Sequence, residues 1–259
     1  MSSTLTQRCY RFYMSTHSGL NDHTACQLIY KRDIKPRLPT ETHRMRVLDI
    51  GCGQGTLVKL MREDGLDAWG VDISEEQVDL ARAEGITQIF LADLQEFLEN
   101  SESTWDVVVA NDILEHLQKQ AVLDTFDRVH KSLTPGGIFL ARVPNAVSPV
   151  GGHVMYGDIT HETWFTRRNV AQLAAVSGFD SIETFPCPPP AHGLKSCARL
   201  AAWKVISGLF KLALTAETGQ LRGHVVTQNL TFVAHKSSAG VARDLVRDLD
   251  GGSTSSNSS

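Results

Sequence analysis

Glycines that alternate with other residues after an acid form the segment best suited to hold a ligand. An apolar run ends at Asp49 and Ile50, and glycines follow at positions 51, 53 and 55. Glycine tolerates a positive φ angle and lets the backbone approach a ligand that a Cβ atom would push away. The pattern is typical of a buried strand that turns sharply into a helix around a nucleotide-like ligand.

Spacing within this loop and two later acids narrow the class of ligand. A dinucleotide-binding loop of the Gly-x-Gly-x-x-Gly type would carry its third glycine at position 56, where this chain has Thr56. Nicotinamide and flavin therefore fit less well, although the loop alone leaves them open. Asp72 ends a short apolar segment where a carboxylate accepts hydrogen bonds from ribose hydroxyls. Asp93 ends another such segment, where it could accept the exocyclic amine of adenine.

Two later segments combine histidines with carboxylates. Glu115 and His116 follow an apolar run, and Asp158 and His161 lie in a loop further along the chain. Imidazole titrates near neutral pH, so His116 and His161 are candidate general bases, with Glu115 and Asp158 as candidate catalytic partners. A structural hydrogen bond is the alternative role for each histidine.

Strand-like segments alternate with helix-like segments around these residues. This alternation predicts an α/β fold with a mostly parallel sheet covered by helices on both faces. In such a sheet the ligand crevice lies at the carboxyl ends of the strands, where these polar residues stand. The expected strands cover residues 47–50, 67–72, 89–93, 105–110, 138–143 and 179–185.

The chain resembles the class I S-adenosylmethionine (SAM) dependent methyltransferases. It shares with them an acid-Gly-x-Gly-x-Gly loop, acids after the second and third strands, a Leu-Glu-His segment at residues 114–116 and a Pro-Gly-Gly turn at residues 135–137. The resemblance implies a Rossmann-like seven-stranded sheet whose last strand, at residues 225–234, is antiparallel. It also implies SAM as cofactor, bound by Asp49, Gly51, Cys52, Gly53, Gln54, Asp72, Ile73, Asp93, Leu94 and Asn111.

This resemblance and the local composition divide the chain into five parts. The first is either a lid over the cofactor or a solvated helix pinned to the sheet. The expected parts are an N-terminal helical leader at 1–45, a SAM-binding core at 46–187, a Pro-rich and helical insertion at 188–222, the last core strand at 223–237 and a flexible tail at 238–259.

The insertion is the most individual feature. Three prolines at 188–190 precede an expected helix at 197–215, where apolar residues cover most of the circumference and Trp203 and Phe210 stand beside lysines. Such a helix could make peripheral contact with a membrane. Packing on the parent domain, or on a second copy in a homodimer, is the alternative.

Composition excludes several other classes of protein. The formal net charge is −4 without a long basic run, so no nucleic-acid partner is expected. Five scattered cysteines, an odd number, argue for a reducing compartment and against structural zinc. We find neither a signal-peptide core nor an uncharged span of about twenty residues. These observations favour a cytoplasmic protein, with the inner membrane face as the place of any peripheral contact.

The acceptor follows only from a looser resemblance. Across most of residues 8–235 the chain is similar to methyltransferases of bacterial polysaccharide and O-antigen gene sets, which implies a sugar hydroxyl on a nucleotide sugar or lipid-linked glycan. Trp164 and Phe165 could stack on a sugar, and Asn145 could bind its hydroxyls. The alternatives are O- or N-methylation of a small aromatic or quinone-like metabolite, and a SAM-binding module without turnover.

A divalent metal is a further open point. Quinone-precursor O-methyltransferases show a similar acid-x-x-Glu-His segment with which a divalent ion has been associated. Asp112, Glu115 and His116 could therefore take Mg²⁺, but three residues at a strand-to-helix junction need not converge on one point. No metal ligand is expected on this ground.

Overall fold

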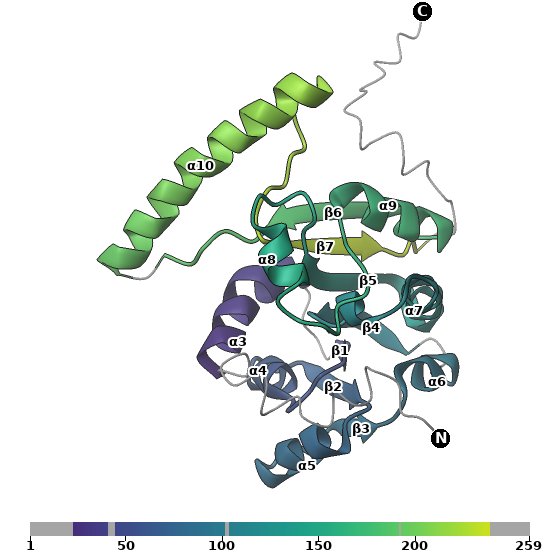
Figure 1. The fold of residues 1–259 in the computed structure, drawn as a ribbon. Coiled ribbons are helices and arrows are strands. Elements are labelled where there is room, and N and C mark those ends of the chain that lie inside the picture. The colour runs from purple at the N-terminus through teal and green to yellow at the C-terminus, as the bar shows by residue number, and fades with distance from the viewer. Residues whose placement is uncertain (1–22, 41–44, 102–103, 192, 239–259) are drawn as a thin grey trace, which may run out of the picture.

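The computed structural model describes residues 23–40, 45–101, 104–191 and 193–238. Its centre is a seven-stranded sheet in the order β3-β2-β1-β4-β5-β7-β6, in which only β7 runs antiparallel to its neighbours (Figure 1). The expected Rossmann-like architecture is thus confirmed. The strands are β1 Arg46–Ile50, β2 Asp67–Asp72, β3 Ile89–Leu91, β4 Trp105–Asn111, β5 Leu133–Pro144, β6 Ser181–Pro186 and β7 Asn229–His235.

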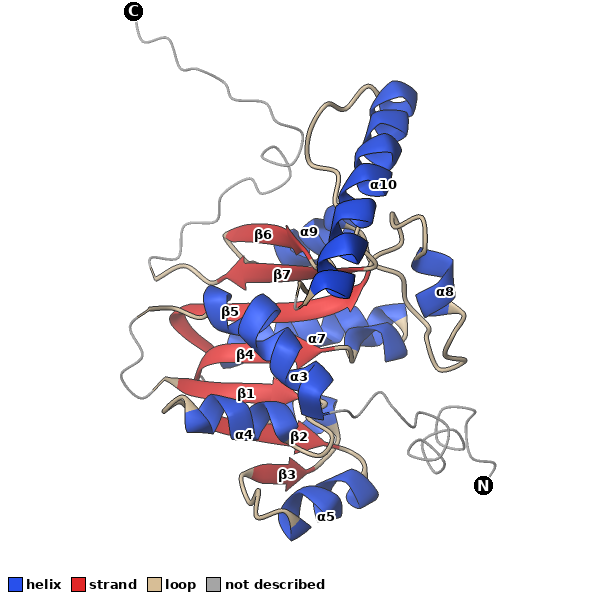
Figure 2. Ribbon diagram, turned by 90° about the vertical axis from the view of Figure 1, so that its left-hand side faces the viewer, coloured by secondary structure: helices blue, strands red, loops and turns tan. Residues whose placement is uncertain are grey.

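Helices cover both faces of the sheet (Figures 1 and 2). One face carries α3 (His23–Ile29), α4 (Thr56–Glu63) and α5 (Glu75–Ala83). The other carries α6 (Leu94–Glu99), α7 (Lys119–Ser132) and α9 (Arg167–Val176). The remaining helical segments are η1 Tyr30–Ile34, η2 Lys35–Arg37, η3 Leu114–His116, α8 Gly151–Met155 and α10 Leu194–Thr218.

Alternation along the strands divides the core into two apolar layers. Val107 and Val109 of β4 face α3 and α4, whereas Val108 and Ala110 face α7 and α9. All four side chains are fully buried. Burial on both faces explains why β4 reads as a continuous apolar run.

Local signals mark several helix starts. The loop glycines lead into α4 at Thr56, and Thr166 caps α9 through a reciprocal capping box with Asn169. Ser74 caps α5 by accepting the Gln77 amide. The Ser74 amide donates to Asp72 rather than to Gln77, so no reciprocal box forms at this position.

The first described segment packs against the sheet. Tyr30 and Ile34 are buried among residues of β1 and α4, while Ala25, Cys26 and Ile29 border the main cavity. This part of the leader therefore forms both a layer of the core and a wall of the cavity. The rest of the expected leader, before residue 23, and the expected tail beyond residue 238 lie outside the described residues.

The insertion forms α10, which is longer at both ends than expected. It lies between β6 and β7 and projects away from the sheet (Figures 1 and 2). Ser196 is its only buried residue. Packing on the parent domain therefore does not account for its apolar surface. In the part of the chain that the structure describes, no helix combines the length and apolarity needed to cross a membrane.

Candidate functional site

The strand order reverses between β1 and β4, and the main cavity opens at their carboxyl ends. Its volume is about 510 Å³. The glycine loop after β1 and Asp72 at the end of β2 line one part of it. Another part is lined by Glu115, His116 and His161. The two groups of polar residues expected from the sequence therefore share one cavity.

Two glycines of the loop are required for different reasons. Gly51 has φ +68°, and a Cβ atom there would lie 2.6 Å from Cγ1 of Ile113. Gly53 has φ +53°, and among the described residues a Cβ atom there would have one atom within 4 Å, Gln77 Oε1 at 3.7 Å. Because Gly53 lines the cavity, a side chain there would enter the space in which a ligand would lie.

Asp72 fixes the shape of this loop. Its Oδ2 accepts the Gly53 amide at 2.7 Å, and its Oδ1 accepts the Ser74 amide at 2.8 Å. Each carboxylate oxygen has a second lone pair, so the same group can also accept ligand hydroxyls. Burial raises the pKa of Asp72, and the amides of Ser74 and Gly53 oppose this rise.

Asp49 lies beneath the loop as a buried carboxyl group. Burial, and then the charge of Asp72, raise its pKa well above the ordinary value. Burial followed by the same two acids also raises the pKa of Cys52, whose sulfur packs against β2 beside Gly70. Cys52 and Gln54 both line the cavity, as the sequence predicts for cofactor contacts.

Asn111 offers an acceptor at the end of β4. Its buried Oδ1 has no hydrogen-bond partner among the described residues, although the residue lines the cavity. An amino group such as that of the methionyl part of SAM would satisfy it. This acceptor, the cradle at Gly53 and the carboxylate of Asp72 together fit an adenosyl and methionyl ligand.

Three expected cofactor residues do not line this cavity: Ile73, Asp93 and Leu94. Ile73 is exposed, and Leu94 packs against the apolar core. Asp93 caps α6, since its Oδ1 accepts the amides of Gln95 at 2.8 Å and Glu96 at 3.2 Å. An acid three residues before Glu96 is itself a helix-start signal, and it indicates this structural role.

A hydrogen-bond chain links two of the expected catalytic residues through a third. Nδ1 of His116 lies 2.8 Å from Oγ1 of Thr160, and that hydroxyl donates to Oδ1 of Asp158 at 2.7 Å. The hydroxyl has only one proton, so Nδ1 of His116 must donate to it. His116 is thereby held as the tautomer whose basic lone pair is on Nε2.

His161 and Glu115 lie beside this chain. The rings of His116 and His161 meet edge to face, with centroids 4.7 Å apart. Burial, and then the charge of Asp112, raise the pKa of Glu115 well above its ordinary value. Within the described residues, Glu115 Oε2 and His161 Nδ1 are buried without a hydrogen-bond partner.

A metal could find three ligand atoms here, but not the three considered from the sequence. The side-chain donors of Glu115, His116 and His161 lie within 4.8 Å of one another. Asp112, the third residue considered from the sequence, is instead bound by Arg142 and lies outside this group. Two imidazoles and one carboxyl suit a transition metal better than Mg²⁺.

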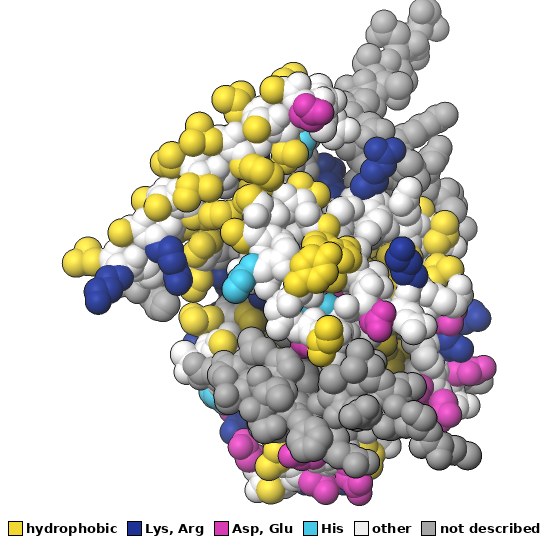
Figure 3. Space-filling view, viewed as in Figure 1, with side chains coloured by type: hydrophobic (Ala, Val, Ile, Leu, Met, Phe, Trp, Pro, Cys, Tyr) yellow, Lys and Arg dark blue, Asp and Glu magenta, His cyan; other side chains and the backbone are white. Residues whose placement is uncertain are grey.

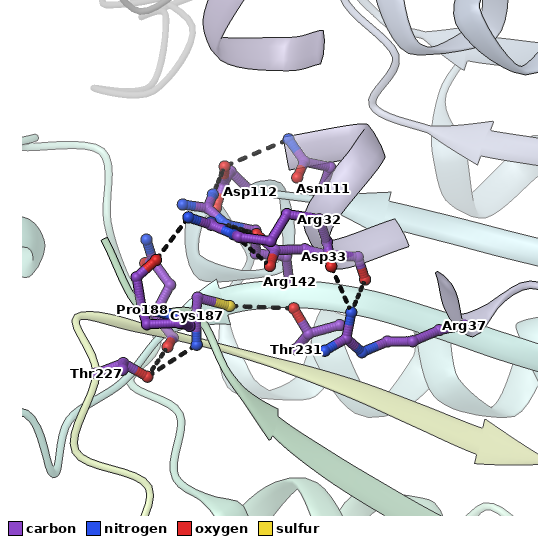
Figure 4. Close-up of polar contacts among 11 residues, drawn as sticks. Arg32, Asp33, Arg37, Asn111, Asp112, Arg142, Cys187, Pro188, Thr227 and Thr231 are labelled. Carbon is purple, nitrogen blue, oxygen red and sulfur yellow. Dashed lines mark hydrogen bonds and ion pairs between the residues drawn. The ribbon is translucent and has the colours of Figure 1, made fainter. Parts of the chain in front are cut away.

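Arg142, like Thr160, is a functional-site residue that the sequence analysis missed. It lies on β5, lines the cavity and bonds Asp112, while its Nε is 3.9 Å from Asp33 of η1 (Figure 4). Burial opposes its charge, but Asp112 and other nearby acidic groups raise its pKa. Asp112 is the one described non-glycine residue with a positive φ, at 55°. An arginine inside an apolar strand was the available signal, because a buried charge needs partners.

The same network reaches the insertion. Arg32 donates to Asp33 at 2.7 Å and to the carbonyl of Pro188 at 2.6 Å (Figure 4). The chain is thus anchored to η1 at the point where it leaves β6.

Two residues expected to bind a sugar are structural. Phe165 is fully buried in the core that α7 and α9 cover. The amide of Asn145 donates to the carbonyls of Val225 and Thr227, at 2.8 and 2.9 Å, and the residue is buried. Neither side chain is available to a ligand. Trp164 instead contacts the ring of Tyr156.

A sheet of this order, with a glycine loop and a carboxylate at its switch point, is the Rossmann-like fold that solved SAM-dependent methyltransferases share. Residues 23–206 match the family described as methyltransferase domain, and the chain belongs to this family.

Similar proteins include the ubiquinone biosynthesis O-methyltransferase of Mesorhizobium japonicum, 32% identical over 122 residues that make up 45% of this chain and 48% of the relative. The enzyme of the same name from Sinorhizobium medicae is 33% identical over 121 residues, or 45% and 47% of the two chains. The matched region thus spans about half the length of these relatives.

Among solved structures, a SAM-dependent methyltransferase from Archaeoglobus fulgidus has a TM-score of 0.64 and 21% identity, covering 88% of this chain and 99% of that one. A phosphoethanolamine N-methyltransferase from Haemonchus contortus has a TM-score of 0.61 and 18% identity, covering 91% and 61%. At these identities the likeness concerns the fold.

Proposed function

We propose that this protein is an O-methyltransferase that moves the methyl group of SAM to a hydroxyl of a small aromatic, quinone-like metabolite. The observation that carries the proposal is the chain Asp158–Thr160–His116, which directs a basic nitrogen at the cavity that the glycine loop also lines. A hydroxyl acceptor needs such a base, since an alcohol or phenol is a poor nucleophile until it loses its proton. The ubiquinone O-methyltransferase names of the relatives support the same acceptor class.

The cofactor end is assigned to Asp49, Gly51, Gly53, Asp72 and Asn111. Asp72 would accept ribose hydroxyls, and Asn111 Oδ1 would accept the methionyl amine. SAM, when bound, supplies an electrophilic methyl group carried by a sulfonium. Gly53 keeps this end of the cavity open, because a side chain there would enter it.

The acceptor end is assigned to His116 and the residues around it. Nε2 of His116 accepts the proton of the acceptor hydroxyl, and Thr160 and Asp158 stabilise the imidazolium that forms. His161 packs against His116 and holds its ring. Ile29, Ile113 and Val154 line the cavity with apolar surface, which suits an aromatic ring and excludes water.

A sugar acceptor has less support. Phe165 and Asn145 are committed to the core, so the expected sugar-binding wall is lost. The relatives reported above are named for ubiquinone biosynthesis, and the O-antigen context rests on the looser sequence resemblance alone.

The test is an incubation with SAM and two panels of acceptors, phenols with catechols and nucleotide sugars. S-adenosylhomocysteine and a methyl ether should form with a member of the first panel. His116→Ala should reduce kcat by about 10²-fold or more while SAM affinity, measured by calorimetry, stays unchanged. His161→Ala should have a smaller effect on kcat. Turnover of a nucleotide sugar alone would overturn the acceptor class, and SAM binding without turnover of any acceptor would favour a binding module.

A further inference from the structure

Helix α10 exposes a row of large apolar side chains to solvent. Val205, Leu209 and Leu212 are 65%, 65% and 67% exposed, and Leu194 at the start of the helix is 91% exposed. Their spacing places them on one stripe, with Ala198, between Leu194 and Val205, on the same stripe. Figure 3 shows hydrophobic side chains along the whole length of this helix. A soluble monomer rarely exposes so continuous an apolar surface without a partner.

Basic residues border the stripe on both sides. Lys195 and Arg199 follow Leu194 and Ala198 by one position, whereas Lys204 and Lys211 precede Val205 and Leu212 by one position. One position is a turn of about 100° around the helix, so the two pairs lie on opposite borders. The helix contains four basic residues and one acidic residue, Glu217, although the whole chain has a formal net charge of −4.

A second group of exposed apolar residues lies at the rim of the cavity. Val150, Tyr156 and Ile159 are 42%, 82% and 74% exposed, in the segment that contains α8. His153 and Gly157 of this segment line the cavity. Figures 1 and 2 place α8 and α10 on the side of the sheet toward which the parallel strands point. The α8 segment therefore borders the open end of the site, and α10 lies on the same side of the sheet.

We infer that α10 and residues 150–159 form one surface that binds a membrane containing anionic phospholipid. The helix lies in the interface plane, with Val205, Leu209 and Leu212 inserted among the acyl chains and the flanking lysines and arginine reaching the headgroups. Anionic headgroups complement the local positive charge within an otherwise acidic chain. In this position the rim of the cavity meets the lipid.

A second copy of the chain is the competing occupant. A two-fold dimer formed through α10 would place the same stripe of both copies face to face. Each copy of α10 would bring four basic residues and one acidic residue to this interface, and like charges repel. An anionic surface avoids this repulsion, so the charges favour lipid.

The test is co-sedimentation of the full chain with vesicles of phosphatidylcholine alone or mixed with phosphatidylglycerol. Binding should require phosphatidylglycerol and weaken as salt concentration rises. Val205→Glu with Leu209→Glu should reduce binding about 10-fold or more, since each change places a charge in the apolar interface. Val176→Glu is the matched control, because Val176 is 70% exposed but lies at the end of α9, outside the proposed surface. This variant should bind vesicles as the unchanged protein does.

A second pair of substitutions tests the charge. Lys204→Gln with Lys211→Gln should lower binding to the mixed vesicles and leave the melting temperature unchanged, since both side chains are exposed. The inference is wrong if the Val205 and Leu209 changes leave vesicle binding intact. It is equally wrong if the protein ignores both vesicles and sediments as a dimer that Leu209→Glu dissociates. Binding is measured without turnover, so these results do not depend on the proposed reaction.

Discussion

His116 and Thr160 are joined by a hydrogen bond of 2.8 Å between Nδ1 and Oγ1, although 44 residues separate them in the chain. Thr160 is 2% exposed, and its hydroxyl donates a hydrogen bond to Asp158. One buried hydroxyl therefore decides which nitrogen of His116 is basic.

Replacing Thr160 tests this relationship directly. Thr160→Val should lower kcat by about 10- to 100-fold, the usual effect of losing a group that orients a catalytic histidine. SAM affinity should not change, and Thr160→Ser should restore most of the activity because it keeps the hydroxyl. The measurement is kcat and KM across a pH series. A purely structural role would give Thr160→Ser and Thr160→Val the same rate.

The cofactor assignment is tested by comparing two aspartates. Asp72→Ala removes the acceptor of the Gly53 and Ser74 amides and should weaken SAM binding by about 10²-fold, as expected for two charge-assisted bonds. Asp93→Ala removes the cap of α6 and should cost about 1 kcal/mol of stability with little change in affinity. Calorimetry and urea unfolding measure the two effects. If Asp93→Ala weakens SAM binding as much as Asp72→Ala, Asp93 contacts the cofactor after all.

Gly51 in the glycine loop and Gly65 after α4 form a matched pair for measuring stability. Gly51→Ala combines an unfavourable positive φ, costing about 1–2 kcal/mol, with a collision against Ile113 that adds about 1–3 kcal/mol. Gly65 has φ +87°, but no atom of the described residues lies within 4 Å of a Cβ position there. Gly65→Ala should therefore cost only the about 1–2 kcal/mol that the positive φ causes. Urea unfolding of both variants gives the difference. Equal losses would show that the loop relaxes away from Ile113.

Glu115 predicts a particular dependence of stability on pH. Because its pKa is raised in the folded protein, folded Glu115 keeps its proton above about pH 4.5, where the unfolded chain has released it. The folded state then binds more protons than the unfolded state, so stability falls as pH rises toward the folded pKa. Glu115→Gln should make this slope less steep by up to about 1.4 kcal/mol per pH unit. Urea unfolding at several pH values measures it, with Glu63→Gln, at the exposed end of α4, as the control; an unchanged slope in Glu115→Gln would contradict the assignment.

Removal of divalent ions should leave turnover unchanged. The raised pKa of Glu115 disfavours the carboxylate form that a metal ion needs, and Arg142 already binds Asp112. Turnover is measured before and after EDTA treatment. Loss of activity that Mg²⁺ or Zn²⁺ restores would show that Glu115, His116 and His161 hold an ion.

Local patterns in the sequence predicted most of the fold and several of the residues that line the cavity. The helix over 56–63 and the cap at Thr166 follow from residues within one turn of each other, and so does the carboxylate at Asp72. The contacts of Thr160 with His116 and of Arg142 with Asp112 could not be found in this way, since the partners lie 44 and 30 residues apart in the chain. The placement of α10 was equally hidden, because apolar residues cover most of its circumference and did not indicate that the helix would project from the sheet.

Antiparallel pairing at the end of the sheet has a consequence for how this enzyme can diversify. Pro186 pairs with Leu230, so the chain re-enters the sheet beside the point from which it departed. Segments of different lengths can therefore be inserted between Pro186 and Leu230 without changing the strand register or the conformation of the glycine loop. Helix α10 is thus an insertion outside the sheet and the glycine loop. Exchanging it could change the surface to which the enzyme binds while the reaction stays the same.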